Sequence, residues 1–351
     1  MTGSRKVFIH VGHGKTGTSF LQNAMAINRN VLSAHGIEFL SAKSDEDANA
    51  GLVTSGNARD CLTSLSALND FLDQTDSAKS VLLSSEFAFL HFPNLIESEE
   101  GAAALFEILI RHGIDAIDLL LFIRNPISFA VSDWLQRVKA HRGTDTIEEF
   151  LESQHARYPE RASRLLDLVD GRNFVSLTIF NYSRHRDEIL DLFCGWLSID
   201  AAEWRLPKRR HVNRSLTYSE AYVCRALNAS GARFAGHLGK HLVDEVDNPP
   251  LTPICLSQPV QEAFIQSVYH SMEKVSARTA CGHGYEIDWI GLQDGQEVEL
   301  VFNEKQVDII VRFLIDARSS GDKLLVESLS RRIDGLKKAD ETTAQNKEAP
   351  G

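Results

Sequence analysis

The first half of the chain alternates between short apolar runs and segments with helical periodicity. The apolar runs cover residues 7–11, 80–85, 118–123 and 173–179. Apolar residues recur at helical spacing over residues 20–27, 62–72, 102–111, 127–142 and 186–197. The four short apolar runs have the length and character of strands that are buried on both faces. Since strands that alternate with helices build mostly parallel sheets, the pattern predicts an α/β fold, a three-layer sandwich whose central sheet is flanked by helices.

Polar signals refine these elements. Thr146 and Glu149 have the spacing of a capping box, which predicts that a helix begins there. Residues 41–60 are small and polar and predict a loop, in which Asn57 is more readily explained by a turn than by contact with a substrate.

The pattern changes near residue 215. Helical periodicity then dominates, over residues 217–228, 259–277 and 303–337, with a proline-rich loop at 244–259. We therefore expect an α/β core over residues 1–225, a mostly helical C-terminal extension over 226–338 and a flexible tail over 339–351.

Composition narrows the classes of protein. With 43% hydrophobic and 24% charged residues, the chain of 351 residues is typical of a globular enzyme, and it has no apolar run long enough for a transmembrane segment. Its five cysteines never have C-x-x-C spacing, which favours a reducing compartment over disulfides or zinc. No apolar targeting segment precedes the first run, so we expect a cytoplasmic protein. The net charge of −11 argues against nucleic acid or anionic membranes as partners. Nothing in the sequence indicates the oligomeric state.

The segment after the first run, GHGKTGTS at residues 12–19, has the composition of an anion-binding loop. A strand, a glycine-rich loop and a helix start together present backbone N–H groups and a favourable helix dipole, and a lysine adds a full charge. A nucleoside-triphosphate loop reads G-x-x-x-x-G-K-[ST], but here Thr18 follows Gly17 and the lysine is Lys15, inside the loop. For a dinucleotide fingerprint the third glycine falls on Gly17, but no acidic residue follows at the expected distance. Both ordinary nucleotide loops are therefore poor matches.

A second basic motif follows the run at 118–123. It consists of Arg124, Asn125 and Pro126, with Ser132 later in the helix that Pro126 is suited to begin. A guanidinium group suits a phosphate because it presents several donors and keeps its charge. No acidic pair has the spacing of metal ligands, and no metal is expected.

Together these motifs resemble sulfotransferases that use 3′-phosphoadenosine 5′-phosphosulfate (PAPS), in particular bacterial, carbohydrate-sulfotransferase-like members. The 5′-phosphosulfate loop of that family is similar to Gly14, Lys15, Thr16, Gly17, Thr18 and Ser19, and its 3′-phosphate motif is similar to Arg124 and Ser132. Residues 212–217 resemble a segment of many bacterial members, so Asn213 and Arg214 are candidates to complete the 3′-phosphate pocket. The arginine-lysine-glycine loop of the cytosolic members is absent, and residues 208–214 are candidates to replace it. The resemblance covers roughly residues 6–225.

The resemblance implies a P-loop NTPase-like fold, PAPS as cofactor, and in-line transfer of a sulfuryl group to a hydroxyl acceptor, a glycan or glycolipid by family analogy. Lys15 would meet the charge that develops on the bridging oxygen. Glu86 is the first candidate for the general base, because it follows a predicted strand at the end where such sheets carry their sites. His13 is the second. The alternatives are an ion pair or helix cap for Glu86, and a residue that merely lines the loop for His13.

Two other functions remain open. One is an atypical P-loop kinase or NTPase, against which the displaced lysine and the lack of a strand ending in an acidic metal ligand both count. The other is a non-catalytic nucleotide-binding module, against which the joint presence of Lys15, Arg124 and Ser132 counts.

Overall fold

The computed structural model describes residues 5–12, 14–41, 44–50, 56–207, 214–230, 235–254, 256–291 and 299–319. The chain divides into two compact units. The first comprises residues 1–129, 157–212 and 264–288, and the second comprises 130–156, 213–263 and 289–351. Residue 225, the expected end of the α/β core, lies within the second unit. Residues 130–156 leave the first unit, and residues 264–288 return to it.

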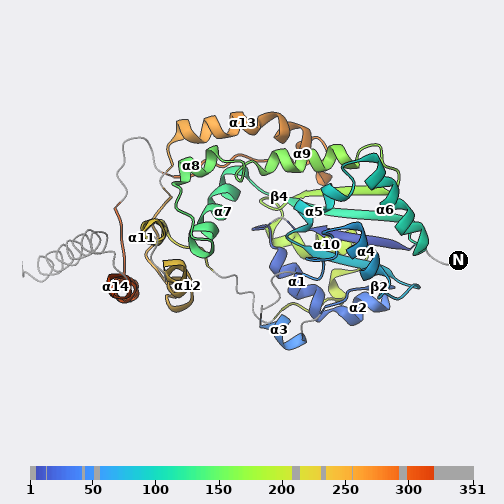
Figure 1. Cartoon of the computed structure of the whole chain (residues 1–351), viewed down its shortest axis with the longest axis horizontal. Coiled ribbons are helices and arrows are strands. Elements are labelled where there is room, and N and C mark those ends of the chain that lie inside the picture. The colour runs from blue at the N-terminus through green and yellow to red at the C-terminus, as the bar shows by residue number, and fades with distance from the viewer. Residues whose placement is uncertain are drawn as a thin grey trace, which may run out of the picture. The chain divides into compact units, whose positions relative to one another are not determined.

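The first unit is built on a five-stranded parallel sheet, which confirms the predicted α/β fold (Figure 1). The strands are β1 (Lys6–Val11), β2 (Ile37–Glu38), β3 (Ser80–Ser85), β4 (Ala116–Ile123) and β5 (Val175–Asn181). Their order across the sheet is β2-β3-β1-β4-β5, so β1 lies between β3 and β4. Ile9 of β1 pairs with Leu83 on one side and with Leu119 on the other.

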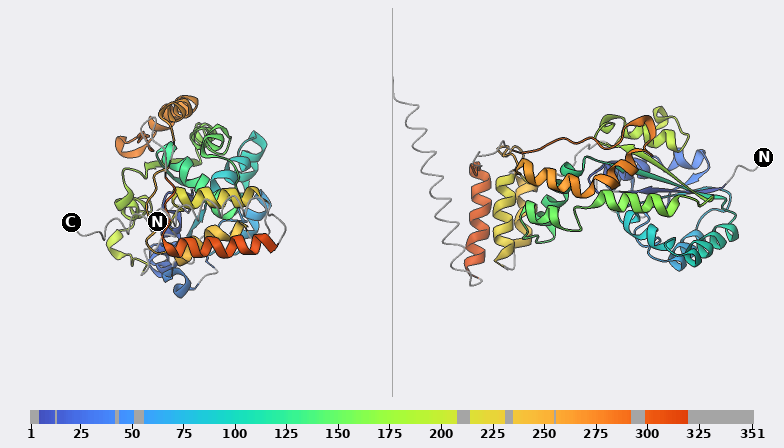
Figure 2. Two further views of the ribbon diagram at one scale, coloured as in Figure 1. Left: turned by 90° about the vertical axis from the view of Figure 1, so that its left-hand side faces the viewer. Right: turned by 90° about the horizontal axis from the view of Figure 1, so that it is seen from above.

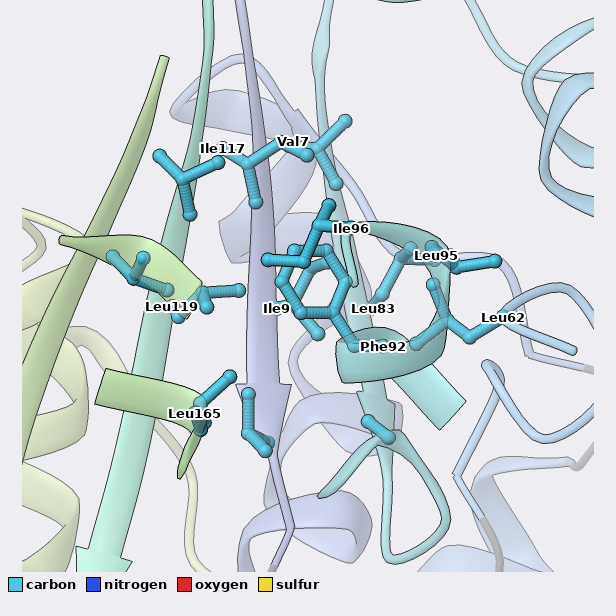
Figure 3. Packing of buried hydrophobic residues seen from close by; sticks show 14 of the residues in the cluster. Val7, Ile9, Leu62, Leu83, Phe92, Leu95, Ile96, Ile117, Leu119 and Leu165 are labelled. Atoms are coloured by element: carbon cyan, nitrogen blue, oxygen red, sulfur yellow. The ribbon is translucent and has the colours of Figure 1, made fainter. Parts of the chain in front are cut away.

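Alternate residues of each strand enter two separate cores. Val7, Ile9 and Val11 of β1 pack against α4 (Leu65–Leu72), α5 (Ala88–Leu95), α6 (Glu99–Arg111) and α9 (Tyr158–Val169) (Figure 3). Phe8 faces the other core, with α1 (Thr18–Ile27), α2 (Arg29–Ala34) and α10 (Ile189–Trp196). Because the side-chain period of a strand is two, both faces need a helical layer. The three-layer sandwich follows.

Most predicted elements are present with shifted ends. The capping box at Thr146 and Glu149 is confirmed: the Thr146 hydroxyl accepts from the Glu149 N–H, the Glu149 carboxylate accepts from the Thr146 N–H, and α8 spans Ile147–Glu152. The loop expected over residues 41–60 contains the short helix α3 (Asp45–Asn49), which has its own capping box at Ser44.

Asn57 has a structural role. Its amide group donates to the Leu82 carbonyl and accepts from the Ser84 N–H, at 2.9 and 2.8 Å. Since β2 pairs only with Ser80 and Val81 of β3, Asn57 satisfies backbone groups farther along that strand.

The second unit is helical in its described part. It contains the longer part of α7 (Pro126–Ala140), α8, α11 (Tyr218–Ala229), α12 (Ala235–Glu245) and α14 (Glu304–Ser319). Helices α11, α12 and α14 lie side by side (Figure 2). Helix α13 (Gln258–Ser276) begins in this unit and ends in the first. None of the described helices combines the length and the hydrophobicity needed to cross a lipid bilayer.

Candidate functional site: the carboxyl edge of the sheet

The strand order places the carboxyl ends of β1 and β4 at the position where open α/β sheets bind their ligands. From β1 the chain runs outward to β2 through α1 on one face, whereas β4 is followed, by way of α9 on the opposite face, by β5. Adjacent strands whose connections leave in opposite directions open a binding crevice at their carboxyl ends. Residues 14–19 follow β1, Arg124 follows β4, and Glu86 follows β3 on the far side of β1. The first unit therefore brings these three groups to one edge.

The loop after β1 is tightly constrained. Gly12 donates its N–H to the Ser85 carbonyl at 3.0 Å, and a Cβ atom on Gly12 would lie 2.8 Å from a methyl group of Thr18. Lys15 and Gly17 both have positive φ, 72° and 77°. A lysine in this region stores backbone strain, and strained backbone of this kind is concentrated at functional sites. Alternation of left- and right-handed residues also turns successive N–H groups toward one concavity, where an anion can bind.

Helix α1 begins at Thr18 with Gly17 as its N-cap, and a glycine has no side chain to cap the first turn. A Ser or Thr hydroxyl caps α4, α6, α8 and α11, whereas the N-cap residues of α5, α9 and α10, like Gly17, make no side-chain cap hydrogen bond. Thr16 and Thr18 are buried, and Ser19 is exposed. A helix start that directly follows a glycine-rich loop is a position where an external anion can bind.

Arg124 links the two predicted anion-binding motifs. Its Nη1 donates to the Lys15 carbonyl at 3.0 Å, and its Nε donates to Ser128 Oγ at 3.1 Å. Within the described part of the chain, no carboxylate pairs with this guanidinium group, and these two bonds use only two of its five N–H groups. Burial lowers the pKa of Arg124, and so does the nearby Arg186, although a guanidinium keeps its charge. Among the described residues, the other three N–H donors of Arg124 meet no protein acceptor and can serve a ligand.

The backbone of Arg124 is held by a buried tyrosine. The Tyr158 hydroxyl accepts from the Arg124 N–H at 2.8 Å and donates to the Arg124 carbonyl. This pair of hydrogen bonds fixes the residue at the exit of β4.

Glu86 lies close enough to Lys15 to interact electrostatically with it. Burial raises the pKa of the Glu86 carboxyl group, and the Lys15 ammonium group partly offsets this by lowering it. A carboxylate with a raised pKa and a cationic neighbour can accept a proton, which is the property expected of a general base.

A cluster of three buried polar residues contains one each from β1, β3 and α1, and β1 and α1 flank the loop in the sequence. His10 Nδ1 and Ser84 Oγ lie 3.0 Å apart, and the Gln22 amide donates to the same hydroxyl at 3.4 Å. All three residues are fully buried. Burial lowers the pKa of His10 to about 3, so this histidine is neutral at physiological pH.

The described part of the first unit does not include the remaining predicted residues. His13 and Asn213, with residues 208–212 of the basic cluster, lie outside the described residues. Ser132 is half-buried on α7, in the part of that helix that belongs to the second unit. The hydroxyl group that pairs with Arg124 is that of Ser128, one helical turn earlier.

Arg214 has a structural role instead of the predicted place in a phosphate pocket. All five of its N–H groups are used within the second unit. They donate to both carboxylate oxygens of Glu220 and to the carbonyl groups of Ser215, Leu242 and Val246. Since Glu220 is completely buried, Arg214 is needed to compensate its charge, and no donor remains for a phosphate.

Sequence reasoning missed three contributors to the site. Ser128 and Tyr158 hold Arg124, and Arg186 places an exposed second cation near it. Arg186 had a usable signal, because it lies shortly after β5, the strand beside β4. Tyr158 had none, since its contact spans 34 residues.

Comparison with family models, with curated proteins and with solved structures found no match. The geometry of the edge is therefore the basis for the functional argument.

Proposed function

We propose that the protein is a sulfotransferase that moves a sulfuryl group from PAPS to a hydroxyl acceptor. The observation that carries the proposal is the hydrogen bond from Arg124 to the Lys15 carbonyl. It joins the lysine-containing loop after β1 to an arginine after β4 that has N–H donors without an acceptor among the described residues. Two separate cationic groups on adjacent strands suit a ligand with two separated anionic groups, such as a nucleotide phosphorylated at both the 3′ and 5′ positions.

The chemistry assigns a role to each described residue. PAPS supplies an activated sulfuryl group and a phosphate leaving group. The N–H groups of residues 16–19 and the Lys15 ammonium group would stabilise the charge that grows on the bridging oxygen. Arg124 would hold the 3′-phosphate, and Glu86 would take the proton of the attacking hydroxyl. The resemblance of the motifs favours a carbohydrate or glycolipid as the acceptor.

One observation favours a second candidate, an atypical P-loop kinase or NTPase. Glu86 directly follows β3, which lies beside β1, and a carboxylate at this position could bind a magnesium ion. Against this candidate, the lysine stands inside the loop, at position 15, instead of after Gly17.

Calorimetric titration distinguishes the candidates. 3′-Phosphoadenosine 5′-phosphate (PAP) would be titrated into the wild type, Lys15→Ala and Lys6→Ala, with ATP and magnesium as the competing ligand. Lys6 is the matched control because it pairs with Asp118 at the amino end of the same strand. We expect PAP to bind the wild type and Lys6→Ala alike, and Lys15→Ala roughly 10- to 100-fold more weakly, as for the loss of a charged hydrogen bond. Binding of ATP–magnesium in preference to PAP would refute the proposal and support the kinase.

A further inference from the structure

Residues 283–286, here called the return segment, lie against the carboxyl ends of β4 and β5 although they come from late in the chain. They follow α13 and the short helix η3 (Ala280–Gly282) and belong to the first unit. Asn125, just after β4, donates its amide N–H to the Glu286 carbonyl at 2.8 Å. Asn181, the last residue of β5, donates in the same way to the Gly284 carbonyl at 2.6 Å. Two asparagines from adjacent strands thus hold one segment.

Each asparagine uses its other amide atom to shape the loop that carries it. Asn125 Oδ1 accepts from the Ser128 N–H at 2.8 Å, which caps α7, and Asn181 Oδ1 accepts from the Ser183 N–H at 2.9 Å. The Ser183 hydroxyl in turn accepts from the Asn125 N–H at 3.0 Å. The return segment is therefore connected by a chain of hydrogen bonds to Ser128, the residue that binds the Arg124 side chain.

Two ring contacts extend the same interface. The Tyr285 ring meets the Tyr158 ring edge to face, with centroids 5.9 Å apart, and Tyr158 holds the Arg124 backbone. The centroids of the His283 and His185 rings are 5.4 Å apart, and His185 directly precedes Arg186 in the chain. Each residue of the return segment thus contacts the end of β5, one of the loops after β4 and β5, or Tyr158, which holds the Arg124 backbone.

The return segment is itself fixed to α13. The Tyr285 N–H donates to Ser276 Oγ at 2.9 Å, and a Cβ atom on Gly284 would lie only 2.4 Å from the Ser276 Cβ. Only glycine allows this approach. The end of α13 is joined to the sheet layer through the ion pair of Arg278 with Asp170 of the α9 C-cap, at 2.8 Å.

We propose that the return segment positions Arg124 for its anionic ligand, with Asn125 and Tyr158 transmitting the constraint. This inference rests on the proposed function, since it assigns Arg124 to the 3′-phosphate. The physical reason is that Arg124 has no carboxylate partner within the described part of the chain to fix its orientation. Its pose depends on its backbone, on Ser128 and on Lys15. A pre-oriented guanidinium group binds a phosphate with a smaller loss of conformational freedom.

The test uses Asn125→Ser and Gly284→Ala in the full chain. Serine at 125 can still cap α7 but is too short to reach the Glu286 carbonyl, and it adds no charge. Alanine at 284 displaces the return segment from Ser276 without changing either loop. The matched control is Asn28→Ser, because the Asn28 amide likewise binds a distant backbone carbonyl, that of Arg205, away from this edge.

PAP and adenosine 5′-monophosphate (AMP) would be titrated calorimetrically into each protein, with urea unfolding as a check of the fold. We expect each variant to lose about fivefold in affinity for PAP, as for one hydrogen bond, while its affinity for AMP stays within twofold of wild type. If the asparagine only stabilised the fold, the substitution would weaken the binding of PAP and AMP equally. Asn28→Ser, which removes a comparable hydrogen bond, would then show the same loss.

The outcomes separate this inference from the function on which it rests. Unchanged PAP affinity in both variants, or equal losses for PAP and AMP, would overturn the positioning role alone. Failure of the wild type to bind PAP would overturn the proposed function and this inference with it. A loss confined to PAP in Gly284→Ala would be decisive support, because that substitution lies 160 residues away from Arg124 in sequence.

Discussion

Two arginines, Arg124 and Arg214, show how differently a protein can hold a partly buried charge. Arg214, in the second unit, donates all five of its N–H groups to protein acceptors, among them both oxygens of the buried Glu220. Arg124, in the first unit, donates to one carbonyl and one hydroxyl group, and no carboxylate within the described residues neutralises it. The sequence motifs assign both to a phosphate, and the contacts distinguish them.

The difference separates a structural cation from one kept for a ligand. A buried ion pair whose hydrogen bonds are all satisfied adds little by itself, but its loss strands a charge. A guanidinium group with unused donors is held at a cost in stability that a bound anion recovers. Substitution of Arg214 should therefore act mainly on stability, and substitution of Arg124 mainly on ligand affinity.

The largest effect is expected for Arg214→Leu. It leaves Glu220, whose side chain has 0% exposure, without its cation, and the remaining donors to that carboxylate are the Thr217 N–H and the Gln306 amide. We expect the free energy of unfolding to fall by roughly 3–5 kcal/mol, measured by urea denaturation. The affinity for PAP should stay within twofold.

The double variant Arg214→Leu with Glu220→Leu is the control, because removing both charges should restore much of the lost stability. If Arg214→Leu kept the wild-type free energy of unfolding but lost affinity for PAP, the structural assignment of Arg214 would be wrong.

Arg124→Ala tests the other side of the comparison. Losing a charge-assisted bond to a phosphate should weaken PAP binding by about 1.5–3 kcal/mol, which is roughly 10- to 150-fold, measured by calorimetry. Urea denaturation should show less than about 1 kcal/mol of change, because no carboxylate is stranded. Arg164→Ala, which removes an exposed cation of the same unit paired with Glu97, is the charge-matched control. A large loss of stability with unchanged PAP affinity would make Arg124 a second structural arginine.

The same contrast explains how far the sequence predicts this molecule. The buried strands, the parallel sheet and the capping box at Thr146 follow from local patterns, because the period of apolar residues and the cap chemistry act over a few residues. The helix α5 was not predicted, since its apolar residues cover almost all sides and Pro93 lies inside it. Helix α9 was not predicted either, although its apolar stripe was present in the sequence.

The site is predictable only where one strand end defines it. Lys15, Glu86 and Arg124 each follow an apolar run, so the rule for parallel sheets places them together. Arg214 was misassigned because the burial of its partner Glu220 cannot be read from the sequence, and because Leu242 and Val246, which also accept from it, lie 28 and 32 residues away. The contacts of the return segment could not be predicted for the same reason, since Asn125 and Glu286 are 161 positions apart in the sequence.

His10 adds a third way to bury a basic side chain, without charge. Burial lowers the pKa of His10 to about 3, below its ordinary value near 6.5. The unfolded chain therefore binds a proton that the folded chain does not, and stability is lost as the pH falls below about 6.5. We expect a slope that approaches roughly 1.4 kcal/mol per pH unit, measured by urea denaturation between about pH 7 and 5.

His10→Gln should flatten this slope, whereas His35→Gln, which replaces a partly exposed histidine paired with Glu203, should not. An identical slope in His10→Gln and the wild type would show that His10 is not the group responsible.

Glu86 is the acidic counterpart of Arg124, and the smallest effect is expected there. Burial already raises the pKa of its carboxyl group, and a bound phosphate near Lys15 should raise it further by repulsion. PAP binding should then take up a fraction of a proton, and affinity should increase as the pH falls toward that pKa. Calorimetry in buffers of different ionisation enthalpy measures the uptake, and Glu86→Gln should abolish its share while leaving the proton exchange of the PAP phosphates themselves. Equal uptake in the wild type and Glu86→Gln would place the carboxylate too far from the ligand to serve as the base.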